Sequence, residues 1–484
     1  MNILFLSPEA VPFAKTGGLG DVAGSLPRAL AASEKVTLMI PGYATEEIRG
    51  AAAETVDSFL LPGEGSPQVA VVRKATLSAG LSVVFIHNQE LFGRAGLYGD
   101  DAGDYPDNFT RFLFFQRAAL QFIARKGLHF DIVHANDWQT ALFPLLMRMA
   151  PVSEPLRRAR SVFSIHNLGF QGIFPAAAFH ESGLPEHLFS PEALEFYGDL
   201  NCLKAGIIFA DRLVTVSPNY AREILTPEKG FGLDGLLRKH AHKLLGILNG
   251  VDYGQWDPRR DPFIARPYPP ETTAAKRENK AALLAELGLS APAGTPLLAM
   301  ISRLSQQKGI DLLPRLLPRL FQQDALFVLL GKGDRSLTND MEALAARFPE
   351  RMRFLNAFDE KAAHRLQAAA DILFMPSVYE PCGLNQIYAM RYGAAPVVRA
   401  TGGLEDSVVE FDPASGQGTG FKFSGNDLDG IMAAVQKALT AHADPGTWDR
   451  IQKNAMAMDF SWEKTVLRYL DLYKKSLSED AQHV

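Results

Sequence analysis

The sequence predicts an α/β protein made of two doubly wound domains. Short apolar runs rich in β-branched residues alternate with helical patterns, and the runs are apolar on both faces, as strands of a covered parallel sheet are. The alternation stops over residues 256–269, where Pro, Arg and Asp cluster, and then resumes. We therefore expect two mainly parallel sheets covered by helices, with a domain boundary at 255/256.

The first domain is expected to span residues 1–255. Its predicted strands cover 2–7, 35–41, 68–74, 81–88, 131–136, 160–167, 212–217 and 244–251. Its predicted helices include 22–32, 108–126, 140–149 and 194–210. The segments 68–74 and 81–88 could instead form an antiparallel hairpin.

The second domain is expected to span residues 256–460. Its predicted strands cover 296–302, 325–331, 352–358, 371–377, 395–400 and 419–423, with a helix over about 384–393. The amphipathic pattern in 461–484 predicts a last helix, which could cross back to the first domain. Because parallel sheets bind ligands at the carboxyl ends of their strands, two such domains predict a ligand cleft between them.

Composition favours a globular protein of the cytoplasm. Hydrophobic residues make up 47% of the 484 residues, and the net charge of −5 offers no broad basic field for nucleic acid or an anionic membrane. The two cysteines, Cys202 and Cys382, favour neither a disulfide framework nor a thiolate metal site. No basic leader and no long uncharged apolar run is present, and Asp427-Leu428-Asp429 is better explained as a helix N-cap than as a metal site.

A glycine-rich turn, Lys15-Thr16-Gly17-Gly18-Leu19-Gly20-Asp21, follows the first predicted strand. Gly18 would let the backbone approach a phosphate, Lys15 could neutralise it, and Asp21 could cap the next helix or hold a hydroxyl. The alternative is an ordinary turn with a solvated lysine. The glycine spacing differs from the G-x-G-x-x-G dinucleotide fingerprint.

Histidines end two of the predicted strands. His166 is followed by Asn167 and a Gly-Phe-Gln-Gly turn, which predicts a polar loop at the ligand-binding edge of the sheet. His87 and His134 are better explained as core residues.

Cations and glycines follow strands of the second domain. Arg303 ends its first strand and Lys308 comes five residues later, which suits a diphosphate, although a solvated polar loop is the alternative. Glu380-Pro381-Cys382-Gly383-Leu384 places a carboxylate before helix N–H groups, a pattern that suits a sugar hydroxyl beside a phosphate. Thr401-Gly402 opens another helix and could supply N–H donors.

Together, these motifs resemble the bacterial glycogen synthase and plant starch synthase family. The matching segments are K-T-G-G-L-G-D at 15–21, H-N at 166–167, R-L-S-Q-Q-K-G at 303–309, E-P-C-G-L at 380–384 and T-G-G-L at 401–404. The resemblance implies a GT-B fold, with two Rossmann-like domains facing a central cleft. It also implies metal-independent, cofactor-free, retaining transfer of glucose from ADP-glucose to the non-reducing 4-hydroxyl of an α-1,4-glucan, in glycogen biosynthesis.

The resemblance implies roles for individual residues. The catalytic group would be His166, Glu380, Arg303 and Lys308. The residues binding donor and acceptor would be Lys15, Gly18, Asp21, Tyr98, Asp137, Asn167, Asn249, Phe358, Cys382, Gly383, Leu384, Thr401 and Gly402. Within this set, Tyr98 would lie on the acceptor side, and Phe358 would stack on adenine where the family usually has Tyr.

Three other functions are open at this stage. UDP-glucose could be the donor, although Tyr388 stands where many UDP-sugar enzymes of this fold have a second Glu. A catalytically silent glucan-binding protein is disfavoured because the charged motif residues are all present. A nicotinamide dehydrogenase is disfavoured by the glycine spacing. The oligomeric state is not predicted.

Overall fold

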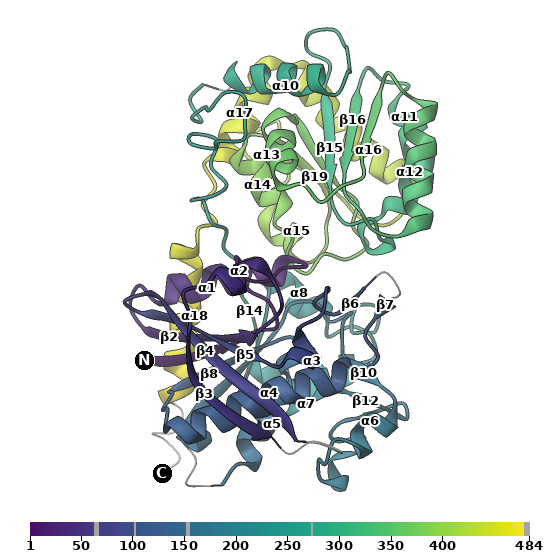
Figure 1. Cartoon of the computed structure of the whole chain (residues 1–484). Coiled ribbons are helices and arrows are strands. Elements are labelled where there is room, and N and C mark those ends of the chain that lie inside the picture. Colours follow the sequence, from purple (N-terminus) through teal and green to yellow (C-terminus); the bar gives the residue numbers. More distant parts are fainter. Residues whose placement is uncertain (62–66, 101–102, 152–154, 273, 479–484) are drawn as a thin grey trace. The chain divides into compact units, whose positions relative to one another are not determined.

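The computed structural model describes residues 1–61, 67–100, 103–151, 155–272 and 274–478 (Figure 1). The chain forms two compact units. The first contains Met1–Val216, Ala221–Gly250 and the chain from Trp462 onward, and the second contains Ser217–Tyr220 and Val251–Ser461. The division after Gly250 comes before the expected boundary at 255/256, and Val251 already forms a parallel bridge with Ser461 of its own unit.

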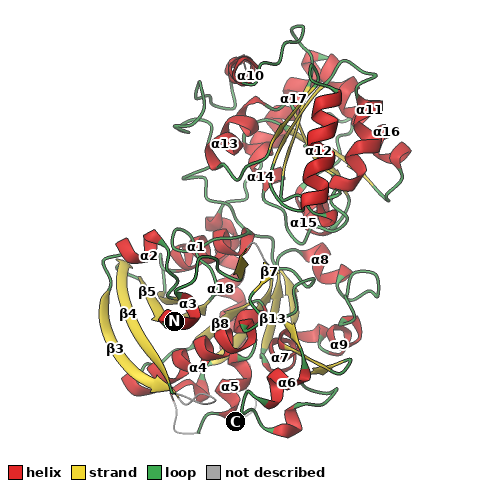
Figure 2. Cartoon of the chain, turned by 45° about the vertical axis from the view of Figure 1, so that its right-hand side comes forward, coloured by secondary structure: helices red, strands yellow, loops and turns green. Residues whose placement is uncertain are grey.

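The sheet of the first unit has the order β14-β13-β9-β8-β1-β2-β5-β4-β3. Its strands are β1 (Asn2–Leu6), β2 (Lys35–Pro41), β3 (Glu54–Leu61), β4 (Gln68–Ser78), β5 (Leu81–His87), β8 (Ile132–Asn136), β9 (Arg160–Ile165), β13 (Arg212–Thr215) and β14 (Leu244–Gly246). Neighbouring strands are parallel except in two pairs at one edge, β3–β4 and β4–β5, which are antiparallel (Figure 2). The hairpin alternative for 68–88 is therefore confirmed.

Helices and short hairpins complete the first unit. The helices are α1 (Gly18–Leu30), α2 (Glu46–Gly50), α3 (Gln89–Phe92), α4 (Asn108–Lys126), α5 (Phe143–Met149), α6 (Ala176–His180), α7 (Cys202–Phe209), α9 (Asp234–Lys239) and α18 (Trp462–Ser478), and α8 (Pro218–Glu223) spans the division of the chain. The short strands are β6 (Gly99–Asp100), β7 (Gly103–Asp104), β10 (Ile173–Phe174), β11 (Glu195–Phe196) and β12 (Asp199–Asn201). The expected helix over 194–210 is wrong in its first half, because Tyr197 and Gly198 adopt positive φ angles and turn β11 back onto β12.

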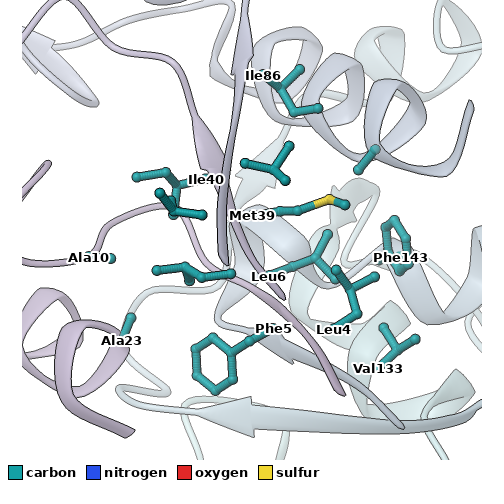
Figure 3. Packing of buried hydrophobic residues seen from close by; sticks show 14 of the residues in the cluster. Leu4, Phe5, Leu6, Ala10, Ala23, Met39, Ile40, Ile86, Val133 and Phe143 are labelled. Carbon is teal, nitrogen blue, oxygen red and sulfur yellow. The ribbon is translucent and has the colours of Figure 1, made fainter. Parts of the chain in front are cut away.

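Strand β1 lies in the centre of the first core. Leu4, Phe5 and Leu6 are fully buried and pack near Met39 of β2 and Val133 of β8 (Figure 3). The terminal helix α18 belongs to this core and packs against α1. Its Tyr473 hydroxyl lies 2.7 Å from Nδ1 of His134, which confirms His134 as a core residue.

The second unit is a fully parallel sheet with the order β17-β16-β15-β18-β19-β20. Its strands are β15 (Leu297–Ile301), β16 (Leu326–Leu330), β17 (Met352–Leu355), β18 (Ile372–Met375), β19 (Ala395–Arg399) and β20 (Phe421–Phe423). Its helices are α10 (Ala274–Glu286), α11 (Leu313–Leu320), α12 (Arg335–Arg347), α13 (Glu360–Ala369), α14 (Asn385–Arg391), α15 (Gly402–Ser407), α16 (Leu428–Ala443) and α17 (Pro445–Met456). Alternate residues of β15 enter two different cores, so both faces of the sheet are covered, as the sequence predicts.

Both units share one topological feature. Counted along the chain, the parallel strands of the second sheet run 3-2-1-4-5-6, and β5, β2, β1, β8, β9 and β13 of the first sheet follow the same order. The strand order therefore reverses between β1 and β8 in the first unit and between β15 and β18 in the second. Ligands of open α/β sheets bind at the carboxyl ends of the strands beside such a reversal.

Two further observations concern the described residues as a whole. None of their helices combines the length and apolarity that crossing a bilayer demands. Nowhere among them do three or more His, Cys, Asp and Glu side chains gather as metal ligands. Asp427 accepts a hydrogen bond of 2.6 Å from the N–H of Gly430, which confirms it as the N-cap of α16.

Candidate active site

The loop after β1 leads directly into α1, which begins at Gly18, earlier than the predicted 22. Asp21 therefore lies in the first turn of the helix, and its Oδ1 is 2.7 Å from Nζ of Lys15. The N–H groups of Gly18 and Leu19 donate to no described residue, and a Cβ at Gly17 or Gly18 would meet nothing within 4 Å. The start of α1 thus has two open N–H groups near Lys15, an arrangement that suits an anion.

A buried glutamate that the sequence interpretation missed supports this loop. Glu9 is 4% exposed, and its carboxylate accepts hydrogen bonds from the N–H groups of Thr16 and Gly17 and from the hydroxyls of Thr16 and Tyr98. The only sequence signal was an acidic residue directly after a buried strand. Tyr98, predicted on the acceptor side, is thereby tied to the Lys15 loop.

His166 follows β9 as predicted and is buried. Its Nε2 lies 2.9 Å from Oδ1 of Asn136, whose amide nitrogen donates to the carbonyl of Leu6. That second bond fixes the orientation of the amide, so Nε2 of His166 carries the hydrogen and Nδ1 is an acceptor. Burial lowers the pKa of His166 to about 3, so the imidazole is neutral near pH 7.

Asp137 follows β8 and holds the His166 backbone. It has a positive φ of 55°, is 8% exposed, and its Oδ1 accepts a 2.7 Å hydrogen bond from the N–H of His166. Burial raises the pKa of Asp137 to about 7, against the opposing effect of hydrogen bonds from the N–H groups of His166 and Asn167. The left-handed backbone and the buried carboxyl both indicate a functional position.

The two predicted asparagines differ in their surroundings. The Asn167 side chain accepts a hydrogen bond of 3.0 Å from the N–H of Gly169 and so closes the turn that follows His166. Asn249 lies after β14, is 5% exposed, and its Oδ1 has no hydrogen-bond partner in the described part of the chain. Asn167 therefore shapes the loop, whereas Asn249 has a buried acceptor that no described residue satisfies.

The strand reversal of the second unit brings Lys308 and Glu380 together. Nζ of Lys308 lies 2.5 Å from Oε2 of Glu380, and the hydroxyl of Ser377 donates to the same oxygen at 3.0 Å. The side chains of Lys308 and Glu380 are 17% and 7% exposed. Oε1 of Glu380 takes no part in these bonds, and Arg303 is exposed and forms no ion pair with a described residue.

Backbone donors surround Glu380. The N–H groups of Gly383 and Leu384 donate to no described residue. Gly402 has a φ of 45°, and a Cβ there would lie 2.0 Å from the carbonyl oxygen of Glu380, so only glycine fits this close approach. The N–H of Gly403 donates to that same carbonyl, which fixes the loop of the buried Thr401 against the loop of Cys382.

Two aromatic positions have different surroundings. Phe358 follows the edge strand β17 and is 71% exposed, so the sheet order does not bring it beside Lys308. Tyr388 is buried and stacks on Trp256 at 4.1 Å between ring centroids, and Trp256 stacks on His364 at 3.7 Å. Position 388 therefore packs the interior of the second unit.

Known proteins resemble the chain from end to end. It matches the starch synthase catalytic domain family over residues 2–239 and the glycosyl transferases group 1 family over residues 288–457. The glycogen synthase of Anaeromyxobacter dehalogenans strain 2CP-C is 45% identical over 98% of this chain and 99% of that protein. The chain belongs to the glycogen and starch synthase family. The glycogen synthase of Myxococcus xanthus strain DK1622 is 44% identical over 99% of this chain and 100% of that protein.

One solved structure gives the same family, and a second gives the fold. The catalytic domain of starch synthase IV from Arabidopsis thaliana, bound to ADP and acarbose, has a TM-score of 0.91 and 35% identity, covering 99% of both chains. Sucrose-phosphate synthase from Thermosynechococcus elongatus has a TM-score of 0.63 at 19% identity over 99% of both chains, which supports the fold alone. The sequence motifs implied a GT-B fold for this member of the glycogen and starch synthase family. That fold is confirmed.

Proposed function

We propose that this protein transfers glucose from ADP-glucose to the non-reducing 4-hydroxyl of an α-1,4-glucan in glycogen biosynthesis. The observation that carries the proposal is the family membership, since identity to glycogen synthases extends over nearly the whole chain. The charged motif residues of both units lie beside the strand reversals, where this fold class binds ligands. A protein that only binds glucan would not need them.

Each unit offers groups that suit an anion. In the first unit these are Lys15 and the open N–H groups of Gly18 and Leu19. In the second they are Arg303 and Lys308. We assign the diphosphate of the donor to these four residues, Lys15, Gly18, Arg303 and Lys308. Negative charge grows on the departing ADP, so cations already in place stabilise the transition state more than the bound ground state.

Sugar hydroxyls have matching partners. Oε1 of Glu380 can accept from a glucose hydroxyl, and the N–H groups of Gly383 and Leu384 can donate to one. The neutral His166 presents Nδ1 as an acceptor, because Nε2 donates to Asn136. We therefore assign His166 to orientation of the transferred glucose. By family resemblance we assign Asn249 to the same pocket and Tyr98 to the glucan acceptor.

Three finer details are also part of the proposal. We propose retention of configuration without a metal or cofactor, with Arg303 and Lys308 supplying the positive charge at the leaving group. We propose that Thr401, Gly402 and Cys382 contribute main-chain contacts to the donor. We also propose a cytoplasmic location, which fits the absence of a disulfide between Cys202 and Cys382.

The test is transfer of labelled glucose from ADP-glucose onto glycogen, with UDP-glucose in parallel and each reaction run with and without EDTA. We expect strong incorporation from ADP-glucose. Incorporation from UDP-glucose alone would overturn the assignment of ADP-glucose as the donor. UDP-glucose is tested because Phe358 is solvent-exposed and lacks the hydroxyl usual at this position. No incorporation from either donor, with glycogen binding intact, would instead favour a silent glucan-binding protein. Loss of activity only when EDTA is present would overturn the metal-independent mechanism.

A further inference from the structure

Glu9 is a buried carboxylate without a cation. It lies just after β1, and it forms no ion pair with any described residue. Four neutral groups satisfy it instead. The N–H groups of Thr16 and Gly17 donate to Oε2 at 2.6 and 3.3 Å, and the hydroxyls of Thr16 and Tyr98 donate to Oε1, both at 2.8 Å.

These four donors come from two segments that are distant in sequence. Thr16 and Gly17 immediately precede α1, whereas Tyr98 is 89 residues from Glu9. The Tyr98 segment is held firmly, because the carbonyl of Tyr98 accepts from the N–H of Tyr105 at 2.9 Å and from Nδ2 of Asn108 at 2.8 Å. One carboxylate therefore links the Lys15 loop to a braced aromatic side chain.

A neutral side chain would occupy this position at a lower desolvation cost. Burial of Glu9 raises its pKa, and the four hydrogen bonds only partly offset that effect. A carboxylate does, however, accept from two N–H groups and two hydroxyls at once, which an apolar residue cannot do. Gly20 also packs here, since a Cβ on it would lie 3.2 Å from Oε2 of Glu9 and 3.1 Å from Cγ of Lys15.

We propose that Glu9 is a positioning residue of the first unit. Its single carboxylate holds both the loop on the donor side and the tyrosine on the acceptor side. It fixes the Thr16-Gly17 backbone, so that Lys15 and the open N–H groups of α1 point to one anion site. It also fixes the hydroxyl of Tyr98. The inference rests on the proposed function, which assigns Lys15 to the nucleotide sugar and Tyr98 to the glucan.

The test uses Glu9→Gln, which keeps the shape and removes the charge. We expect kcat/KM for ADP-glucose to fall about 10- to 100-fold. The control is Asp211→Asn at the opposite, amino end of the strands. Asp211 also accepts from a backbone N–H and a hydroxyl, both of Ser161 at 2.8 and 2.7 Å, but it pairs in addition with Arg148 and Arg160. Asp211→Asn should lose thermal stability and keep kcat/KM within about threefold of the native value.

Coupling separates positioning from general destabilisation. In a Lys15→Ala background, Glu9→Gln should change the Kd for ADP less than about threefold, although it weakens ADP binding about tenfold in the native background. In a Tyr98→Phe background, Glu9→Gln should likewise change the KM for maltooligosaccharide less than it does in the native background. Equal effects of Glu9→Gln in all backgrounds would overturn the proposal.

Two further outcomes complete the test. If Glu9→Gln does not fold, Thr16→Val is used instead, because it removes one of the hydroxyl groups that donate to Glu9. We expect its kcat/KM for ADP-glucose to fall about three- to tenfold. Native kcat/KM in that variant would overturn the inference. Absence of glucose transfer by the native protein would instead overturn the proposed function, whereas an active native protein with an equally active Glu9→Gln variant would overturn the inference alone.

Discussion

Both units place a buried glutamate in a loop that follows a strand at the topological reversal, Glu9 after β1 and Glu380 after β18, but they satisfy it differently. The groups that donate to Glu9 among the described residues are neutral hydroxyl and N–H groups. Glu380 is paired with the mostly buried ammonium of Lys308. The lysine of the first unit, Lys15, is 46% exposed and pairs with Asp21 near the surface.

The comparison teaches how stability and function are divided. In the second unit the cation predicted to bind the donor also neutralises a buried carboxylate, so removing it leaves an uncompensated charge. In the first unit the cation proposed to bind the donor is a surface group, and the buried carboxylate forms no ion pair with a described residue. Function and stability should therefore be coupled at Lys308 and separable at Lys15.

The largest expected effect is that of Lys308→Ala. The variant should lose about 3 kcal/mol of unfolding free energy in urea titrations, because Glu380 remains buried without its partner. It should also bind ADP more weakly and lose at least about 100-fold in kcat. Lys15→Ala should lose similar activity but less than about 0.5 kcal/mol of stability.

A double variant sharpens this contrast. Lys308→Met with Glu380→Met removes both charges and should recover most of the stability lost by Lys308→Ala, with no recovery of activity. A stability loss in Lys15→Ala as large as in Lys308→Ala would contradict the division between the two units.

The next effect contrasts two buried histidines of the first unit. His134 bonds Tyr473 at 2.7 Å and Ser164 at 2.6 Å, and burial lowers its pKa to about 3, as it does for His166. His134→Ala should lose about 3 kcal/mol of stability, with kcat within about threefold of the native value. His166→Ala should lose about 100-fold in kcat and only about 1 kcal/mol.

Urea titrations and initial rates on both variants measure this. Native kcat in His166→Ala would remove His166 from the catalytic group. A large loss of kcat in a folded His134→Ala would contradict its assignment to the core.

Sequence alone located the strand ends, and with them most of the candidate site. The reason is physical, since a buried parallel strand is a short apolar run and the polar residue that ends it is conspicuous. His166 and Glu380 were found in this way, whereas Asp137 came from the family resemblance. Strand β3 was missed because it is an edge strand with a bulge between Thr55 and Asp57, which breaks the alternation.

The partnerships within the site were not predictable in the same way. Lys308 and Glu380 are 72 residues apart, and Tyr98 is 89 residues from Glu9. No local pattern encodes such pairs, because they arise from the order of strands in the sheet. The early start of α1 was also missed, since glycines at its first turn argue against helix by propensity alone.

A smaller effect concerns the pH dependence of stability at Asp137. Its pKa is raised to about 7, so the folded protein holds this proton more tightly than the unfolded chain does. The stabilising contribution is complete below pH about 4 and is lost as the pH rises from about 4 to about 7, by up to about 1.4 kcal/mol per unit. Asp137→Asn should therefore gain stability relative to the native protein across this window.

The histidines act in the opposite direction but do not confuse the test. The contributions of His134 and His166 are lost as the pH falls from about 6.5 toward 3, and both residues are present in the variant and in the native protein. Urea titrations at several pH values then give the difference in unfolding free energy between the native protein and Asp137→Asn. This difference isolates the contribution of Asp137. A difference that is flat from pH 4 to 8 would show that the carboxyl ionises normally.

The smallest effect separates the two aromatic positions of the candidate site. Tyr98 uses its hydroxyl to bond Glu9, whereas Phe358 has no hydroxyl and is 71% exposed. Phe358→Ala should raise the KM for ADP-glucose about three- to tenfold through lost stacking and leave the melting temperature unchanged. Phe358→Tyr should behave as the native protein with ADP-glucose, while Tyr98→Phe should raise the KM for maltooligosaccharide severalfold. Kinetics of the three variants with both substrates would decide this, and a Phe358→Ala variant with native KM would place that ring outside the donor site.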